Sequence, residues 1–387
     1  MLSPLGLAPS FGFGDRLGLA TPGHIAAVKG SGLAPVFAQQ SVRENDRTGR
    51  TPQVVIDDAK RGVEAAGWDA PWGADADHLK TVDDFPPFIA AGYTLFTVDP
   101  GEHVDNAADS DSLAVLKQKT AGIDWDELSS IYLSDDVDSG FGVFDNENLL
   151  RAVVKYAKAI NHTVGMYRRL CQLKDSFDFE ISVDETDAPT TSLEHYFIAN
   201  ELTRAGVKFT SLAPRFIGRF EKGVDYIGDL NALDAEMAKH AAVTAHFGTY
   251  KLSLHSGSDK FSVYPLLVKH WGSRLHVKTA GTSYLEGLRV LAVNELALFE
   301  RIWALGLERY AVDRMTYHVS ADPALVPANL PMPKLLDDFN AREILHVTFG
   351  SAVMKFGPEI KSALVKHADL YNANLQKHFI KHLNLLK

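Results

Sequence analysis

Short β-rich segments alternate with helical patterns along most of this chain, and this alternation limits the possible folds more than any other feature. Each unit is a strand-like run, a polar turn and a helix, an order that predicts a parallel sheet covered by helices. The runs are Phe11–Leu19, Pro35–Gln39, Asp75–Lys80, Thr94–Asp99, Phe177–Asp184, Val207–Pro214, Tyr250–His255, Leu275–Thr279 and Met315–Ser320. So many units favour a closed TIM-like (β/α)8 barrel over an open sheet, with one run left over. Barrels with insertions also reach the 387 residues of this chain as one domain.

Local signals support helices between these runs. Thr51 precedes a proline, which suits the first helical position, and Gly67 is placed to end that helix. The segments 191–194 and 283–286 both read as capping boxes directly after a strand. These positions fit the strand, turn and helix order of a barrel.

The predicted organisation is a catalytic barrel over residues 1–330 and a helical extension over 331–387 that packs on the barrel. A segment from about 100 to 145, rich in Asp, Ser and Gly, is expected to be an insertion or a lid over the barrel mouth. Its acidic run, Asp135, Asp136 and Asp138, is interpreted as a solvated loop rather than a metal site.

Composition excludes several classes of protein. The net charge of -10 and the lack of a basic block argue against a nucleic-acid partner. No apolar run approaches the roughly 20 residues that a membrane helix needs. The single Cys171 excludes a disulfide framework and a cysteine-rich zinc site, and it fits a reducing compartment. Since Met1–Gly14 lacks the pattern of a signal peptide, we expect a cytoplasmic protein with a small-molecule substrate, and a homo-oligomer stays open.

In a barrel of this type the loops after the strands build the active site, so polar residues at strand ends matter most. The first such segment holds Asp77 and His78 between Asp75 and Lys80. An imidazole suits a divalent metal, and a neighbouring carboxylate suits a general base. The alternative interpretation is a polar loop with one hydrogen-bonded histidine.

A second segment places acidic residues on a strand. Glu180, Ser182 and Asp184 alternate and therefore share one face, and Glu185 follows at the strand end. Carboxylates inside a barrel must be paired or used, because unpaired buried charge is costly. A functional role is favoured over the alternative that Asp184 only ties down the loop.

Two further strand ends carry candidates. Glu221 is a candidate metal ligand and Lys222 a candidate partner for a substrate carboxylate, with a surface ion pair between them as the alternative. His255 ends its strand before a small-residue turn that leads to Asp259 and Lys260. A metal ligand is favoured there over a core histidine bonded to a carbonyl group.

The last strand end carries His276 and Lys278 on one face, before a turn of small residues. His318, on the final run, is interpreted as structural or peripheral. The chain has no Walker loop, GxGxxG, HExxH or GxSxG motif. Function is therefore indicated by several strand ends together, each of which carries a carboxylate, a histidine or a lysine. Such a set suits a divalent metal that keeps open positions for substrate oxygens.

Several ordered motifs resemble the tagaturonate epimerase family over nearly the whole chain. They are Asp-Ala-Asp-His-Leu-Lys at 75–80, Ser-Val-Asp-Glu-Thr at 182–186, His-Ser-Gly-Ser-Asp-Lys-Phe-Ser at 255–262, Lys-Thr-Ala-Gly-Thr-Ser at 278–283 and Leu-His-Val-Thr-Phe-Gly at 345–350. The early Asp-His segment more distantly resembles barrel proteins of the tagatose-bisphosphate aldolase group.

The resemblance implies a barrel that interconverts D-tagaturonate and D-fructuronate with a divalent metal in hexuronate catabolism. The metal is left open among Zn, Mn, Ni, Co and Fe. On this sequence the resemblance implies Asp77 and Glu185 as catalytic acid and base, His78, Glu221 and His255 as metal ligands, and Asp184, Lys222, Asp259, Lys260 and Lys278 as substrate contacts. Asp225 or His276 stays an alternative to Glu221 as the third ligand.

The implied reaction inverts a hydroxyl-bearing carbon β to the ketone, whose C–H bond the carbonyl group does not acidify. Cleavage and re-formation of the bond between the α and β carbons is therefore favoured over proton abstraction. The alternatives are another metal-dependent sugar epimerase or isomerase, including one for tagatose and fructose, a class II-like aldolase, or a catalytically silent barrel that supports a partner enzyme.

Overall fold

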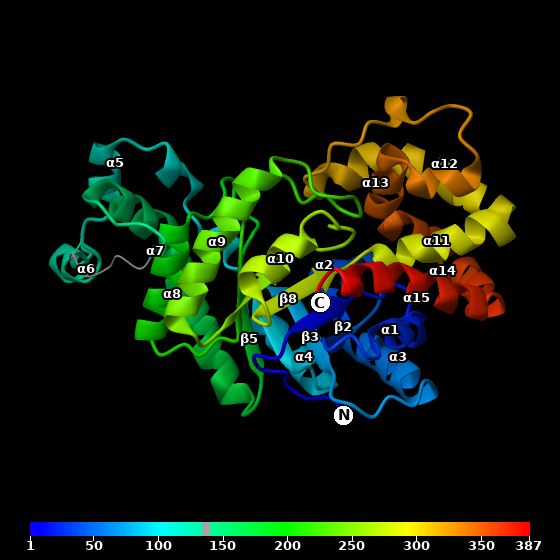
Figure 1. The fold of residues 1–387 in the computed structure, drawn as a ribbon, viewed down its shortest axis with the longest axis horizontal. Helices are drawn as coiled ribbons and strands as arrows, with labels where there is room; N and C mark the ends of the chain where they lie inside the picture. The colour runs from blue at the N-terminus through cyan, green and yellow to red at the C-terminus, as the bar shows by residue number, and fades with distance from the viewer. Residues whose placement is uncertain (134–139) are drawn as a thin grey trace.

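The first eight β-rich segments form the strands of a closed barrel in the computed structural model, which describes residues 1–133 and 140–387 (Figure 1). Neighbouring strands are all parallel, and β1 pairs with β8 to close the barrel. The strands are β1 (Ser10–Phe13), β2 (Ala34–Ser41), β3 (Gly73–Leu79), β4 (Leu95–Val98), β5 (Asp178–Val183), β6 (Ser211–Pro214), β7 (Lys251–Leu254) and β8 (Leu275–Thr279). The predicted (β/α)8 fold is confirmed.

The surplus run is the last one, Met315–Ser320. It contains the end of a 3-10 helix, η5 (Arg314–Thr316), and no strand, because its polar groups contact loops rather than the sheet. Ser320, for example, donates its backbone N–H to the Glu221 carboxylate at 2.8 Å. The first run is also shorter than expected, since Asp15 accepts hydrogen bonds from three following backbone N–H groups and turns the chain.

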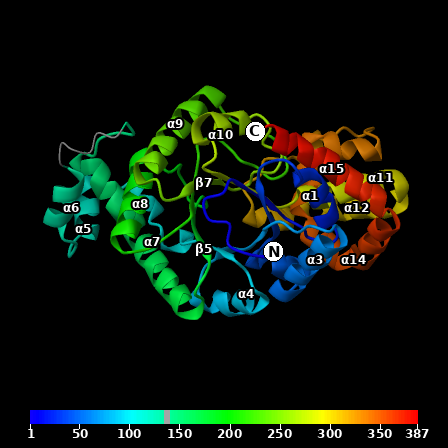
Figure 2. The same cartoon turned by 60° about the horizontal axis from the view of Figure 1, so that its bottom comes forward.

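A helix follows each strand and covers the outside of the barrel (Figure 2). These helices are α1 (Thr21–Val28), α2 (Val42–Thr48), α3 (Pro52–Ala65), η1 (Val82–Asp84), α4 (Phe85–Ala91), α7 (Asn146–Leu173), α8 (Ser192–Arg204), α9 (Leu230–Phe247), α10 (Tyr264–Trp271) and α11 (Thr282–Asn294). The predicted cap at Thr51 is present, and Gly67 just beyond α3 has a φ of 62°. The predicted capping box of α8 is also present.

The second predicted capping box, at Ser283 and Glu286, is wrong. Helix α11 begins at Thr282, and Ser283 instead donates to the Gly14 carbonyl at 2.8 Å. The Glu286 carboxylate accepts a hydrogen bond from Arg289 Nε at 3.0 Å instead of from the start of the helix. A tertiary contact between α11 and the residue directly after β1 therefore replaces the local pattern.

Removal of the α8 cap should weaken the fold measurably. Thr191 accepts from the Glu194 backbone N–H at 3.1 Å, and Glu194 accepts from the Thr191 N–H at 2.7 Å. We expect Thr191→Ala to lower the free energy of unfolding by about 1 kcal/mol, as at other helix N-caps. Urea unfolding measures this loss, and Thr191→Ser, which keeps the hydroxyl, is the control. Equal stability of both variants would contradict the assignment.

The segment between β4 and α7 contains η2 (Gly101–His103), η3 (Asn106–Asp109), α5 (Leu113–Lys119) and α6 (Trp125–Tyr132). Tyr132 at the end of α6 donates to Glu201 of α8 at 2.6 Å. Both views show α5 and α6 at the outer left edge, beside α7 and α8 (Figures 1 and 2). The acidic run at Asp135, Asp136 and Asp138 lies outside the described residues.

The described chain after α11 contains helices and no strand, as predicted for residues 332–387. It forms α12 (Leu296–Asp313), η5, η6 (Pro323–Leu325), η7 (Met332–Asp337), α13 (Phe339–Val347), α14 (Phe349–Lys366) and α15 (Ala368–Asn384). Helix α15 lies against α1, so the last helix of the chain packs on the first (Figure 1). Phe379 of α15 packs on Phe13 of β1, with 5.0 Å between the ring centroids. Within the described residues, no helix has both the length and the apolar character to cross a membrane.

The inside of the barrel is unusually polar. Its buried side chains include Asp75, Thr97, Glu180, Ser253 and Lys278. Barrel interiors are more often filled by branched apolar residues. Because buried polar groups are costly unless they are paired, this interior requires an internal network, and that network leads to the site.

Candidate active site at the barrel mouth

Two adjoining cavities open at the carboxyl ends of the strands. The smaller, of about 60 Å³, lies between β3, β5, β7 and β8, and the larger, of about 340 Å³, lies beside β6. Residues that line both cavities are Arg43, Asp184, Glu185, Lys222, His255, Ser256 and Tyr317. Asp77, His78 and Lys278 line the smaller one alone. Most of the residues proposed from the strand ends therefore line these two cavities.

Lys278 is the centre of the network below the smaller cavity. Its Nζ lies 2.6 Å from Asp75, 2.8 Å from Asp77 and 2.8 Å from Glu180, and it also donates to Thr97. Burial opposes its charge, but the three carboxylates outweigh this and hold the pKa of Lys278 well above its usual value. One cation thus ties together strands β3, β5 and β8.

His78 and His255 face each other above this lysine, with 5.0 Å between their ring centroids. His78 Nδ1 lies 3.0 Å from Asp77, and His255 Nε2 lies 2.7 Å from Glu180. The other nitrogen of each ring lies 3.5–3.6 Å from the same oxygen of Asp184. Two imidazoles from distant parts of the sequence therefore converge on one carboxylate.

The site favours positive charge between these rings. Burial alone would lower the pKa of His255, yet Asp184 and Glu180 raise it to about 9. Asp77 likewise raises the pKa of His78 against the effect of burial. A pair of imidazoles that holds protons this tightly marks a place where a metal cation can replace them.

The carboxylates of β3 differ sharply in acidity. Burial raises the pKa of Asp75 to about 7, even though Lys278 opposes it. Burial also acts on Asp77, but His78 and Lys278 outweigh it and hold its pKa well below the usual range. Such divergence between neighbouring acids is typical of sites that move protons.

The rim of the site is basic. Lys222 is partly buried and donates to Ser256 Oγ at 2.6 Å, and it makes no ion pair with any described residue. Burial, followed by Arg43, lowers its pKa. Arg43 lies 3.4 Å from Glu185, and the side chains of both are 39% exposed. Lys222 is thus a cation that faces the cavity and has no carboxylate partner among residues 1–133 and 140–387.

The structure does not bring the other predicted residues into the imidazole group. Glu221 lines the larger cavity, but its carboxylate already accepts hydrogen bonds from Ser320. The backbone N–H and the hydroxyl group of Ser320 both donate to it at 2.8 Å. Asp225 accepts from Ser262 on the outer side of the loop. His276 lies deep in the barrel beside Ser10 at 2.9 Å, where burial lowers its pKa to about 3.

Asp259 and Lys260 also lie away from the cavity walls. Lys260 is fully buried and donates to the carbonyl groups of Glu221, Val224 and Ser258. Asp259 contacts the helical extension instead of the barrel mouth. His318, expected to be peripheral, lines the larger cavity.

Some residues of the site were not singled out from the sequence. The strand pattern predicts the face on which Glu180 lies but not its partners. In the structure Glu180 makes ion pairs with both His255 and Lys278. Arg43 follows the end of β2, so the strand-end rule applied there would have found it. Asp75 could not be found this way, because its acidity depends on burial and on Lys278.

The donor set suits a divalent cation. Among the described residues, Asp77, His78 and His255 each offer one ligand atom, and these atoms lie within 4.8 Å of one another. Imidazole and carboxylate suit Zn, Mn, Ni, Co and Fe alike. Glu180 on the far nitrogen of His255 matches the carboxylate that usually orients a metal-binding histidine.

Comparisons with known proteins agree with this geometry. A family model described as "UxaE: tagaturonate epimerase" matches residues 3–386. The chain is 44% identical to the "Tagaturonate/fructuronate epimerase" of Thermotoga maritima, with 99% of this chain and 81% of that protein covered. A glycerol-complexed crystal structure of the fructuronate-tagaturonate epimerase UxaE from Cohnella laeviribosi is similar at a TM-score of 0.96 and 37% identity, over 100% of this chain and 83% of that chain.

A more distant structure shares the fold alone. It is a probable tagatose 6 phosphate kinase from Sinorhizobium meliloti 1021, with a TM-score of 0.53 and 10% identity over 98% of this chain and 100% of that chain. The full-length matches, by contrast, confirm the family that the sequence motifs indicated, and they set aside the catalytically silent barrel. The chain belongs to the tagaturonate epimerase family and is an isomerase.

Proposed function

We propose that this protein interconverts D-tagaturonate and D-fructuronate with a divalent cation, by cleavage and re-formation of a carbon–carbon bond. The observation that carries the proposal is the pair of facing imidazoles, His78 and His255, with one oxygen of Asp184 3.5–3.6 Å from each. The relatives from Thermotoga maritima and Cohnella laeviribosi carry the names of this reaction.

His78 and His255 are the proposed metal ligands, with Asp77 or Asp184 as the acidic ligand that lies nearest to them. Glu221 stays a candidate, because it lines the cavity that also contains His255. When bound, a divalent cation would supply Lewis-acid stabilisation of the negative charge that develops on the ketone oxygen. Glu180 and Lys278 hold the ligands in place from below.

The protein supplies the proton transfers. Asp77 is ionised at neutral pH and is the proposed acceptor of the proton on the β-hydroxyl group. As that proton leaves, the bond between the α and β carbons breaks, and its electron pair moves to the former ketone as an enediolate. The aldehyde fragment rotates, the bond re-forms on its other face, and the new alkoxide is reprotonated. Glu185, exposed at the rim, is the proposed second acid/base group.

The experiment is incubation of the purified protein with D-tagaturonate in D₂O, with and without a chelator, followed by separation of the sugar acids. We expect D-fructuronate to form without deuterium at the inverted carbon, and we expect the chelator to stop the reaction. Deuterium at that carbon would exclude carbon–carbon cleavage, and full activity in the presence of chelator would exclude the cation.

Lys222 is the proposed partner of the substrate carboxylate, because its charge lacks an ion pair within the described structure. We expect Lys222→Met to lower kcat/KM for tagaturonate roughly 10- to 100-fold, the effect of one lost charge-assisted hydrogen bond. Any activity on the neutral ketose tagatose should change much less. Steady-state rates on both sugars measure the difference.

A matched control is Lys80→Met, since Lys80 is an exposed lysine that pairs with Glu102 outside both cavities. It should leave both rates unchanged. An equal loss on tagaturonate and tagatose in Lys222→Met would mean that the lysine supports the loop rather than the carboxylate.

A further inference from the structure

Three non-glycine residues in the described chain have a positive φ, one near the end of strand β3 and two in the loop after β7. They are His78 at 55°, Ser256 at 51° and Asp259 at 60°. Residues other than glycine rarely adopt this left-handed backbone conformation, and they keep it where surrounding contacts impose it. Two of the three lie in residues 255–263, the β7 loop, which begins with His255.

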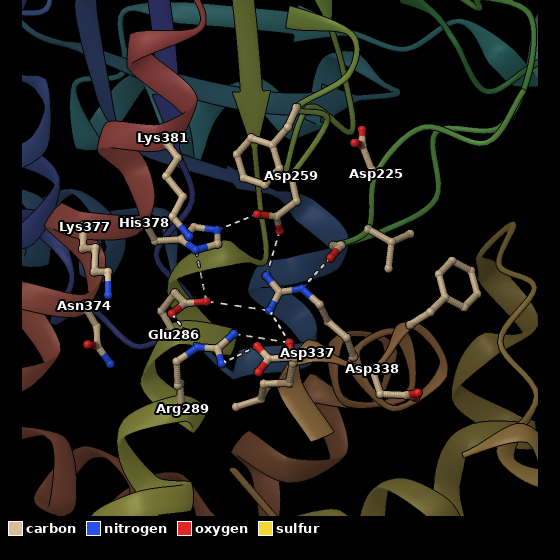
Figure 3. Close-up of a pocket in the computed structure, with 16 residues that line it drawn as sticks. Asp225, Asp259, Glu286, Arg289, Asp337, Asp338, Asn374, Lys377, His378 and Lys381 are labelled. Carbon is tan, nitrogen blue, oxygen red and sulfur yellow. Dashed lines mark hydrogen bonds and ion pairs between the residues drawn. The ribbon is translucent and has the colours of Figure 1, made fainter. Parts of the chain in front are cut away.

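The contacts that hold Asp259 come from the C-terminal helices. Arg342 of α13 donates to its carboxylate at 2.8 Å, and His378 Nε2 of α15 lies 2.5 Å away (Figure 3). The Asp259 backbone N–H donates to His382 Nε2 at 3.1 Å. Burial opposes the negative charge, but Arg342 and His378 outweigh it and hold the pKa of Asp259 well below its usual value.

Asp259, His378 and His382 also satisfy the distances of a metal cluster, within 4.8 Å of one another. Two contacts argue against a cation there. The lone pair of His382 Nε2 already accepts the Asp259 N–H, and the guanidinium of Arg342 already neutralises the carboxylate. The group is therefore a set of hydrogen bonds and ion pairs that hold Asp259 in place. We name it the α15 clamp, and its members are Asp259, Arg342, His378 and His382.

The clamp extends to the second loop of the site. Arg342 Nε donates to the Gly223 carbonyl at 2.6 Å, directly after Lys222. Lys260, next to Asp259, donates to the Glu221 carbonyl at 2.7 Å. Lys222 in turn donates to Ser256 at 2.6 Å. The β7 loop and the loop that carries Lys222 are thus fixed to each other and to α13 and α15.

His378 is held from its other side as well. Glu286 of α11 is buried, and its Oε1 lies 3.4 Å from His378 Nδ1 (Figure 3). His378 therefore lies between two carboxylates, Asp259 and Glu286, and links α11 and α15 to the β7 loop. A cavity of about 490 Å³ lies beside it, lined also by Lys381.

We propose that His378 and Arg342 are positioning residues for the epimerase reaction, which act through Asp259 and the β7 loop on His255 and Ser256. The C-terminal extension then has a catalytic purpose, because it fixes the loop that follows a proposed metal ligand. This inference rests on the proposed function, which makes His255 a metal ligand. The link from His378 and Arg342 to the β7 loop rests on the contacts described above.

The test compares His378→Ala with His378→Gln, whose amide nitrogen can replace Nε2, and with Lys381→Ala, an exposed control on the same helix. Hydrogen exchange of the peptide over 255–263, thermal unfolding, metal affinity and steady-state rates are measured for each. We expect His378→Ala to speed exchange in that peptide roughly tenfold, as a locally opened segment does. Metal affinity should fall on the order of tenfold, the usual effect of a lost outer partner. We expect kcat to fall more than KM rises, with the melting temperature nearly unchanged.

His378→Gln should recover most of the wild-type values, and Lys381→Ala should match the wild type. Wild-type exchange in the β7 loop of His378→Ala, or a loss of activity that only follows the unfolded fraction, would overturn the positioning role. If the wild-type protein itself bound no metal and converted no tagaturonate, the proposed function would fail. The exchange rates would still report on the clamp in that case.

Discussion

His255→Ala should abolish metal binding and reduce kcat/KM for tagaturonate about 1,000-fold, while the barrel stays folded. A cation is worth several kcal/mol to a reaction that develops charge on a ketone oxygen, and about 4 kcal/mol corresponds to this factor. The fold should survive because Glu180, which loses its imidazole partner, keeps Lys278 at 2.8 Å and Ser211 as partners. Metal content by atomic absorption and steady-state rates on the same preparation provide the measurement.

A matched control exists in the same barrel. His276 is a buried imidazole on β8 that lies beside Ser10 and lines neither of the two cavities at the mouth. His276→Asn should keep both the metal and most of the activity. This result would also show that His276 is not the third metal ligand. Retention of stoichiometric metal in His255→Ala, or its loss in His276→Asn, would refute the proposed ligand set.

The sequence was sufficient for the barrel, and most of the residues that it proposes for the site line the two cavities at the barrel mouth. Strand ends are local signals, and the closed barrel places all of them on one face, so His78 and His255 could be paired across 176 intervening residues. The position of Glu185 at the rim could be predicted in the same way, because it depends only on the end of β5.

The residues that could not be placed depend on contacts between distant elements. Asp259 and Lys260 follow a strand end, but α13, α15 and the backbone of the neighbouring loop bind them away from the mouth. Glu221 has a suitable side chain, yet Ser320 from the irregular segment after α12 occupies its carboxylate. A local pattern gives no direction for a side chain in a loop, because tertiary partners decide it. For the same reason Ser283 binds β1 instead of capping its own helix.

The second large effect is expected at Lys278, as a loss of stability that does not require the metal. Lys278→Met keeps the length of the side chain but leaves the carboxylates of Asp75, Asp77 and Glu180 without their common cation. Removal of one partner of a buried ion pair typically costs about 3–5 kcal/mol, because the remaining charge is buried and uncompensated. We expect a loss of this size in the free energy of unfolding, measured in urea on chelator-treated protein at pH 8.

Asp75 offers a way to separate this charge effect from a simple cavity. Burial raises its pKa from 3.8 to about 7 in the folded protein, so this group favours folding at low pH and loses that contribution as the pH rises from 3.8 to about 7. Asp75→Asn alone should therefore be tolerated, and it should flatten the decline in stability between about pH 4 and pH 7, the range between the ordinary pKa of 3.8 and the folded value of about 7. In the Lys278→Met background, the same substitution removes one of the uncompensated charges and should restore part of the lost stability. If Asp75→Asn restores nothing in that background, the loss arises from packing, and the charge network centred on Lys278 is not what stabilises the polar interior of the barrel.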